Sequence, residues 1–362
     1  MNKQATLASR WLAAGVLALT IAACGSDKKT ESVAATTKPA ATSASNAPTP
    51  TNAATPATTD ATTDATTAVA PTDGGAAITL GASLWTGSAV NAWVAKAVIE
   101  ENLGTAVTVT DLDENAIWPA LAAGDVDAAL EIWPSGHAAD RTTYIDEQKA
   151  VVDIGLLGPV AKIGWYIPTF MLKDHPELAT WEGFKDPAVA KLFATAETGA
   201  QGQFLMGDPS YVSFDEQIIK NLNLPLKFVV AGSEAAEVQA IKAAIADETP
   251  LLLQFWQPQW LQSLVDLTEV KLPAFTPECE ASAAAADGKY NCDYPVDNLY
   301  KAASAKLEKK NPAVLAMLKK FSLTTDQQNE ISAMVDNDGM EVADAAKKWI
   351  ADNPDVVKGW LA

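Results

Sequence analysis

Apolar residues in the first part of the folded chain form short runs separated by segments with helical spacing. The runs at 78–84, 107–112 and 126–133 predict strands. Between them, residues 89–102 and 113–123 carry apolar side chains three and four positions apart, which predicts helices. This order of strand, helix, strand, helix and strand is typical of a parallel sheet.

The same alternation continues beyond residue 137. The predicted strands there are 151–154, 160–168, 193–197, 227–231 and 251–256, and the predicted helices are 138–149, 214–222, 233–246, 299–310, 312–321, 325–335 and 343–352. Residues 155–159 are expected to break the chain before a long strand that crosses into a second lobe. We therefore predict an α/β protein with a ligand cleft between two lobes, each a mixed, mostly parallel sheet flanked by helices. The lobes are expected at about 77–162 with 262–362, and at about 163–261.

Three predicted strands end in a tryptophan. Trp85 follows the first strand, Trp133 is followed directly by Pro134, and Trp256 is followed by Pro258. Since proline cannot donate to a sheet ladder, the strands that end at Trp133 and Trp256 should stop there, and Trp85 closes the first apolar run. Ligands bind at the carboxyl ends of strands in open α/β sheets, so we expect the three indoles to converge on one ligand. A single tryptophan in such a position is more often part of a core or a rim.

Aromatic faces of this kind favour a cationic ligand. The π faces are negative and attract cations, and quaternary ammonium groups are the usual example, at about 1–2 kcal/mol for each desolvated face. A carboxylate on the same ligand would need hydrogen-bond donors. Thr86, Gly87 and Ser88 begin a predicted helix, with Ser88 as its expected N-cap, and free N–H groups there favour an anion.

The N-terminal residues predict export. Residues 1–24 have a weakly basic start and an apolar stretch too short to span a bilayer, as in a signal peptide. An aliphatic residue and two small residues precede Cys24, which resembles the lipobox of bacterial lipoproteins and implies lipidation of Cys24. An ordinary signal peptide with an incidental cysteine is the alternative. Residues 25–76 are rich in Ala, Thr and Pro without an aromatic residue, which predicts a disordered tether before the folded body at 77–362.

The charge and the cysteine content indicate which partners are excluded and whether a disulfide is present. The net charge of −19 is spread along the chain without a basic stripe, which argues against nucleic acid as a partner. Cys279 and Cys292 form an even pair in a loop of an exported protein, so we predict a disulfide, with two free thiols as the alternative.

The sequence predicts neither an enzyme nor a cofactor or metal. The only two histidines, His137 and His175, lack metal-ligand spacing, and no G-x-S-x-G or phosphate-binding G-x-x-x-x-G-K motif is present. Two rival hypotheses stay open at this point. A pair of acids could serve a glycosidase, and a lipid-anchored carbohydrate-binding or adhesion protein could present flat aromatic surfaces.

Five motifs together resemble the substrate-binding proteins of glycine betaine/choline/proline ABC importers, which have a type II periplasmic-binding fold. The motifs are Leu84-Trp85-Thr86, the segment 121–127 leading to Ile132-Trp133-Pro134, the segment 162–168, Gly207-Asp208-Pro209-Ser210-Tyr211, and the segment 255–260. The resemblance covers about 77–362. It implies an extracytoplasmic protein, held at the membrane only by its lipid, that passes a quaternary ammonium solute to a permease with a separate ATPase.

The resemblance also implies which residues bind. It places the trimethylammonium cage at Trp133, Tyr211 and Trp256, with Trp85 as an additional aromatic residue. Tyr211 stands where some relatives have tryptophan. Either Trp165 or Tyr166 is expected near the ligand, and strand parity allows only one of them to face the cleft.

Substrate choice stays open at this point. Some relatives have a histidine beside the second cage tryptophan, where this chain has Gln257 and Gln259, and a glutamine amide can bond a carboxylate. An acid facing the site would instead favour choline over betaines. The candidates near strand ends are Asp111, Asp113, Glu114 and Glu131. Of these, Glu131 shares a strand face with Trp133 by parity, with an ion-paired strand residue as its alternative role.

Overall fold

The computed structural model describes residues 75–285 and 287–362. The expectations for the signal peptide 1–24, lipidation at Cys24 and nearly all of the tether 25–76 lie outside these residues. Among the helices of the described part, none is long and apolar enough to cross a membrane.

The predicted βαβαβ unit is present and forms the first half of the fold. It consists of β1 (Ile78–Ala82), α1 (Thr86–Leu103), β2 (Val107–Asp111), α2 (Glu114–Ala123) and β3 (Ala128–Ile132). Strand β1 lies between β2 and β3 and is parallel to both. One predicted detail is wrong: α1 begins at Thr86 after Trp85, and Ser88 Oγ accepts from the Ser83 N–H instead of capping the helix.

The second half repeats this arrangement. It contains β5 (Gly202–Met206), α5 (Asp215–Asn221), β6 (Leu226–Val230), α6 (Glu234–Ala246) and β7 (Leu253–Gln257). Strand β5 is parallel to β6 and to β7. Ser233 caps α6 as its position predicts, since its side chain accepts from the Ala236 N–H.

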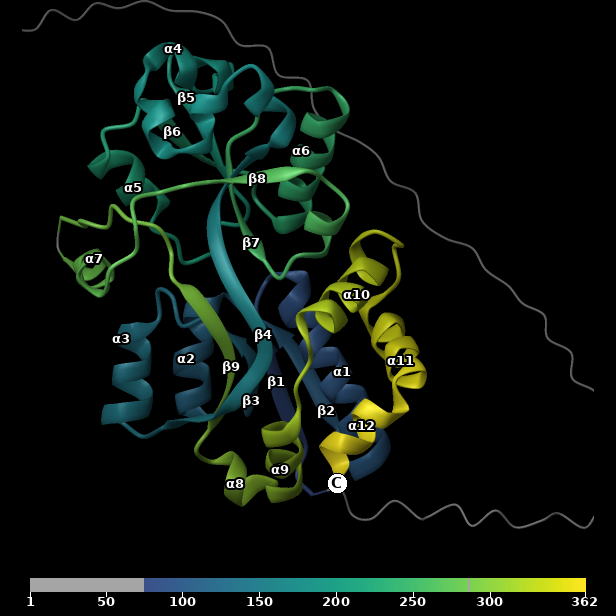
Figure 1. Cartoon of the computed structure of the whole chain (residues 1–362). Coiled ribbons are helices and arrows are strands. Elements are labelled where there is room, and N and C mark those ends of the chain that lie inside the picture. The colour runs from purple at the N-terminus through teal and green to yellow at the C-terminus, as the bar shows by residue number, and fades with distance from the viewer. Residues whose placement is uncertain (1–74, 286) are drawn as a thin grey trace, which may run out of the picture. The chain divides into compact units, whose positions relative to one another are not determined.

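Two long strands connect the halves, as Figure 1 shows. Strand β4 (Val151–Pro168) pairs with β9 (Val296–Ser304) and further along with β7 and β8 (Leu267–Val270), all antiparallel. The whole sheet has the order β2-β1-β3-β9-β4-β7-β5-β6, with β8 on β4. The break expected at 155–159 is two register shifts within one continuous strand, with Gly155 and Gly158 at positive φ.

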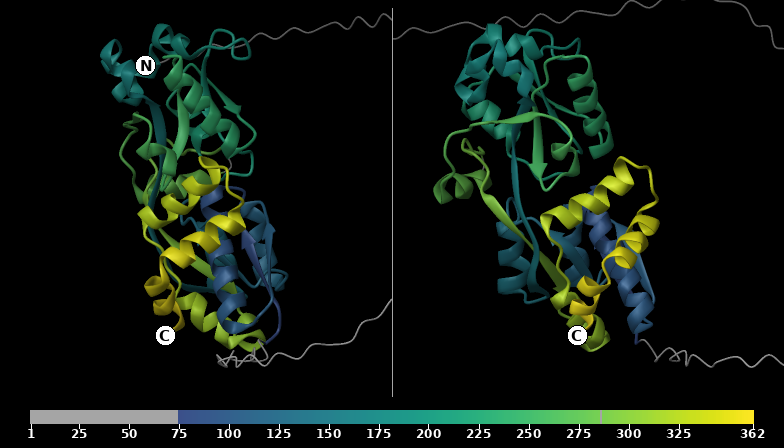
Figure 2. Two further views of the ribbon diagram at one scale, coloured as in Figure 1. Left: turned by 90° about the vertical axis from the view of Figure 1, so that its right-hand side faces the viewer. Right: turned by 45° about the vertical axis from the view of Figure 1, so that its right-hand side comes forward.

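Helices cover both faces of the first half. In Figures 1 and 2, α2 and α3 lie on one face, and α1 with the C-terminal helices lies on the other. The C-terminal helices are α8 (Leu307–Lys310), α9 (Pro312–Lys320), α10 (Thr325–Asp336), α11 (Val342–Asp352) and α12 (Pro354–Leu361). The remaining short helices are α3 (Ala138–Asp140) with a π-helix Arg141–Glu147, α4 (Pro187–Ala190), α7 (Pro277–Ala281) and 3-10 turns at Thr169–Lys173, Pro176–Ala179, Trp181–Lys185, Lys191–Phe193, Trp260–Ser263 and Ser282–Ala284.

Two predicted elements are wrong. The segment predicted as a helix at 299–310 begins with the second half of β9, where Leu299–Ser304 are buried. A strand between two others, buried on both faces, shows no alternation, and its alanines suggest a helix. The strand predicted at 193–197 lies instead at Gly202–Met206. A Cβ at Gly202 would lie 2.3 Å from the Ala190 carbonyl oxygen, so the strand requires glycine at its first position, a residue that is uncommon within strands.

The boundary between the two halves also differs from the prediction, which returned the chain to the first lobe at residue 262. Val270, Leu272, Tyr290, Cys292 and Tyr294 belong to the core that contains β5, α5 and the carboxyl half of β4. Residues up to about 295 therefore pack with the second half, and the chain returns through β9. Antiparallel pairing of β8 with β4 causes this, and it joins segments about 100 residues apart.

The structure pairs Cys279 with Cys292 in a disulfide, at a sequence separation of 13. We predict that Cys279→Ser with Cys292→Ser lowers the free energy of unfolding by about 3 kcal/mol, because the reduced chain regains loop entropy. Urea denaturation would measure the change. Reduction of the parent protein should reproduce it, and equal stability of both forms would contradict the prediction.

Candidate functional site

A cavity of about 400 Å³, including the solvent at its mouth, lies at the carboxyl ends of strands from both halves. Its lining residues come from the ends of β1, β3 and β7, the start of α2, strand β4 and the loop after β5. They are Trp85, Glu114, Trp133, Ser135, Ile163, Tyr211, Val212, Gln254 and Trp256.

Four aromatic side chains form the apolar part of this cavity. Trp85, Trp133 and Trp256 are only 7–8% exposed. The Tyr211 ring packs edge to face on Trp85, with centroids 5.8 Å apart, and on Trp256, with centroids 5.4 Å apart. Trp85 and Trp133 come from the first half, and Tyr211 and Trp256 from the second. The structure thus brings together all four aromatic residues that the sequence predicted as a cage.

Glu131 holds two of the indoles from behind. Its Oε1 accepts from Trp85 Nε1 at 2.7 Å and from Trp133 Nε1 at 3.0 Å. Its Oε2 accepts from Asn91 Nδ2 at 2.7 Å and from Gln328 Nε2 at 3.1 Å. Burial raises the pKa of Glu131 to about 7, although these four hydrogen bonds oppose the shift. Glu131 does not line the cavity, so the structure places it as a support for the rings and not as a wall of the site.

The N-terminus of α1 does not face the cavity as an anion site. The Thr86 N–H donates to Glu234 Oε2 at 2.7 Å, and the Thr86 hydroxyl donates to Asp336 Oδ1 at 2.8 Å. A Cβ at Gly87 would lie 2.6 Å from Gln328 Nε2, so Gly87 allows close packing. The donors of Thr86, which were expected to bind a ligand carboxylate, are therefore occupied by protein carboxylates, because α6 and α10 approach the start of α1 in the folded chain. Burial, together with the charge of Asp336, raises the pKa of Glu234 to about 7.

Trp165, Tyr166 and Gln259 also lie away from the cavity. Trp165 is fully buried in the second core, where its Nε1 donates to Asp215 Oδ1 at 2.7 Å. Ile163, two residues earlier on β4, lines the cavity instead. Gln259 Nε2 donates to Glu234 Oε1 at 3.0 Å. The alternation of side chains along β4 indicated which residues share a face of the strand. It did not indicate which part of the strand the cavity would reach.

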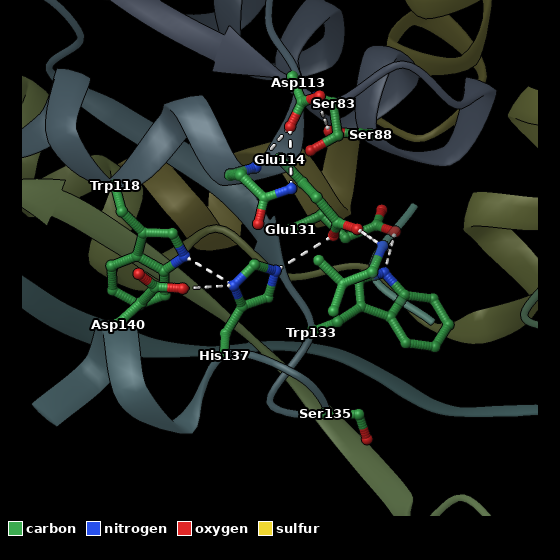
Figure 3. A network of polar contacts seen from close by, with 12 residues as sticks. Ser83, Ser88, Asp113, Glu114, Trp118, Glu131, Trp133, Ser135, His137 and Asp140 are labelled. Atoms are coloured by element: carbon green, nitrogen blue, oxygen red, sulfur yellow. Dashed lines mark hydrogen bonds and ion pairs between the residues drawn. The ribbon is translucent and has the colours of Figure 1, made fainter. Parts of the chain in front are cut away.

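The polar part of the cavity depends on Glu114, one of the acids noted near strand ends. Glu114 Oε1 accepts from the Val212 N–H, and Glu114 Oε2 lies 3.3 Å from His137 Nε2. Figure 3 shows His137 between Glu114 and Asp140, whose Oδ2 lies 2.9 Å from His137 Nδ1. Burial lowers the pKa of His137, but Glu114 and Asp140 outweigh it and raise the pKa overall. His137 therefore orders this network, as its position near Trp133 suggested.

Three buried polar atoms around the cavity have no hydrogen-bond partner among the described residues. They are Ser135 Oγ, Tyr211 Oη and Gln254 Oε1. Buried polar groups in folded proteins are usually paired, so these atoms are available to a polar group of a ligand. The sequence did not single out Ser135 or Gln254, although Ser135 follows the Trp133-Pro134 signal directly.

The family profile described as substrate binding domain of ABC-type glycine betaine transport system matches residues 76–352. The chain belongs to this family. Its members are solute-binding components of transporters and not enzymes, and they act outside the cytoplasm. The enzyme hypothesis is thereby excluded.

Individual relatives agree with this assignment. The trimethylamine N-oxide-binding protein of Pelagibacter ubique (strain HTCC1062) is 30% identical over 285 residues, which is 75% of this chain and 86% of the relative. Lactococcal OpuAC, in its closed liganded form with glycine betaine, has a TM-score of 0.62 at 21% identity, covering 79% of this chain and 99% of that one. A choline-binding protein complexed with choline also has a TM-score of 0.62, at 19% identity, covering 79% and 91%. The two structures establish a two-lobed type II periplasmic-binding fold.

The place of Trp165 in this substrate-binding domain leads to a first test. We predict that Trp165→Phe lowers the free energy of unfolding by about 1–3 kcal/mol, because it leaves the buried Asp215 carboxylate with one donor fewer. Ligand affinity should stay within twofold of the parent. Thermal unfolding and calorimetric titration measure the two effects separately, and a clear loss of affinity would place Trp165 in the site.

A substitution of Glu131 is a second test, and here we expect ligand affinity to fall. Glu131→Leu removes both carboxylate oxygens, so the four donors around it, including both indole N–H groups, lose their acceptor. We expect ligand affinity to fall roughly tenfold, since the indoles lose their support. The near-ultraviolet circular dichroism of the tryptophans should change as well. Unchanged affinity with unchanged dichroism would show that the rings are held by packing alone.

Proposed function

We propose that this substrate-binding domain captures a small solute with a trimethylammonium head, in the cage formed by Trp85, Trp133, Tyr211 and Trp256. The observation that carries the proposal is the meeting of four aromatic side chains from both halves at one cavity. Each desolvated face contributes about 1–2 kcal/mol to binding a quaternary ammonium group. Three or four faces provide several kcal/mol, a large share of the roughly 8 kcal/mol that corresponds to micromolar affinity, and the polar contacts of the solute would supply the rest.

The relatives support this class of solute. The relative at 30% identity is a trimethylamine N-oxide-binding protein, and the family profile is that of glycine betaine transport. Glycine betaine, choline and trimethylamine N-oxide share three methyl groups on a cationic nitrogen. The cage residues would contact that shared head, whereas the other end of the solute would reach Ser135, Gln254 and Glu114.

The solute would then pass to an ABC permease that works with a separate ATPase. The lipobox-like sequence at Cys24 supports attachment to the outer face of the cytoplasmic membrane by a lipid. A flexible tether of about 50 residues has a reach on the order of 40 Å, which would allow the folded domain to meet the permease. The first lobe would comprise about 77–162 and 296–362, and the second about 163–295.

A titration of intrinsic tryptophan fluorescence tests the proposal. Glycine betaine, choline and trimethylamine N-oxide should be compared, and at least one should give a saturable change. Trp133→Ala should weaken binding by roughly fivefold to thirtyfold, the value of one aromatic face. Trp349→Phe is the matched control, because Trp349 is buried between the C-terminal helices and its loss should leave affinity unchanged.

The opposite result would be equally clear. If none of the three solutes changes the fluorescence, and Trp133→Ala behaves like the parent, then the cavity does not bind trimethylammonium compounds. A lipid-anchored carbohydrate-binding protein would then be the better hypothesis, and oligosaccharides should be titrated next.

A further inference from the structure

The charge of the cavity wall is negative. Of the nine lining residues, Glu114 has the only carboxylate, and none is Lys, Arg or His. A ligand carboxylate would therefore meet no basic side chain in this wall. It would meet one like charge at close range, which is unfavourable where water is excluded.

Glu114 is held in place and keeps acceptor capacity for a ligand. Its oxygens contact the Val212 N–H and His137, and a carboxylate has about four acceptor sites. His137 also contacts Asp140, so Glu114, His137 and Asp140 together carry a charge of −1 when His137 is protonated and −2 when it is neutral. Protonation of His137 therefore does not cancel the negative charge of this group.

A second layer of carboxylates lies behind Tyr211. Glu237 is fully buried, and neither of its carboxyl oxygens has a hydrogen-bond partner in the described part of the chain. A Cβ at Gly207 would lie 2.5 Å from Glu237 Oε2 and 3.0 Å from Tyr211 Cε2, so the carboxyl group lies close to the edge of the ring. Burial raises the pKa of Tyr211, and the charges of Glu234, Glu237, Asp208 and Glu114 raise it further. Burial also raises the pKa of Glu237 well above its usual value, and a ligand with net positive charge next to Tyr211 would favour the ionised form of this carboxyl group.

The first N–H group at the nearby helix terminus, another way to bind a ligand carboxylate, is also occupied. The N-terminus of α1 would offer free N–H groups beside Trp85, but Glu234 accepts from the Thr86 N–H there. Glu234 is itself buried and is held by Gln259. A zwitterionic ligand would have to displace this internal contact to use the helix terminus.

We infer that the preferred ligand has a net positive charge, and that it carries a neutral hydrogen-bond donor, such as the hydroxyl of choline, which donates to Glu114. This inference rests on the proposed function and deepens it. Glycine betaine would bring its carboxylate against Glu114. Trimethylamine N-oxide would bring an oxygen that only accepts hydrogen bonds. Glu114 is thus the residue that discriminates among solutes with the same trimethylammonium head.

Calorimetric titration of the purified full chain with four ligands tests the inference. Choline, glycine betaine and trimethylamine N-oxide are compared with ethyltrimethylammonium, which is choline without its hydroxyl group. The parent should bind choline at least tenfold more tightly than either zwitterion. It should also bind choline more tightly than ethyltrimethylammonium, because only choline donates to Glu114.

Glu114→Gln then removes the charge and keeps the shape. Choline affinity should fall roughly tenfold to hundredfold, the effect of losing a hydrogen bond to a charged group. The preference for choline over ethyltrimethylammonium should largely disappear, and glycine betaine should bind better than it binds the parent. Glu101→Gln is the matched control, since Glu101 is exposed on α1 and its loss changes the net charge equally.

Two outcomes would overturn the inference and leave the proposed function intact. One is a parent protein that binds glycine betaine or trimethylamine N-oxide at least as tightly as choline. The other is a Glu114→Gln variant that binds all four ligands with equally reduced affinity. If Glu114→Gln does not fold, the ranking of ligands by the parent still decides the question. Absence of binding by the parent to all four would contradict the proposed function as well.

Discussion

The aromatic cage depends on one buried carboxylate. Glu131 lies on β3 and accepts four hydrogen bonds, two from indoles of the cage and two from amides on α1 and α10. Burying a carboxylate costs several kcal/mol unless donors replace water around it. These four donors do so, and in return the carboxylate fixes the planes of Trp85 and Trp133. A hydrophobic residue at this position would leave two indole N–H groups buried without acceptors.

Acidic side chains also connect the two halves of the molecule. Glu234 of α6 contacts the first turn of α1, Asp336 of α10 accepts from Trp260 Nε1 at 2.7 Å, and Glu114 of α2 accepts from the Val212 N–H. Each of these contacts joins a residue of the first half to one of the second. The edge-to-face contact between Trp85 and Tyr211 does the same. The contacts between the halves and the ring contact that joins the cage are therefore present together in this structure.

The placement of acids explains how one scaffold can serve related solutes. In the proposed function, the aromatic rings would contact the trimethylammonium head, which the related solutes share. The polar residues at the cavity, chiefly Glu114 with Ser135 and Gln254, would meet the end that varies. The electrostatic character of the site is thus set by a few side chains around a shared cage, and this is where members of such a family can differ without a change of fold.

The sequence by itself determined the local features. Tryptophans at the ends of three apolar runs, two of them closely followed by proline, predicted three cage residues, and the motif at 207–211 supplied the fourth by resemblance. The Cys279–Cys292 pair was also predicted, because it depends on two residues near one another in the chain. Strand alternation likewise predicted β1, β2 and β3 with their helices to within a few residues at each end.

Only the tertiary structure decided what lies behind and beside the cage. The strand β9 looked helical because both its faces are buried. The helix terminus at Thr86 looked free because its partner Glu234 lies 148 residues away. Glu131 looked like a residue that meets the ligand, whereas folding brings Asn91 and Gln328 to its second oxygen and the two indoles to its first. Local pattern shows which side chains share a face of a strand. Long-range packing determines which of them face the cavity and which form hydrogen bonds within the protein.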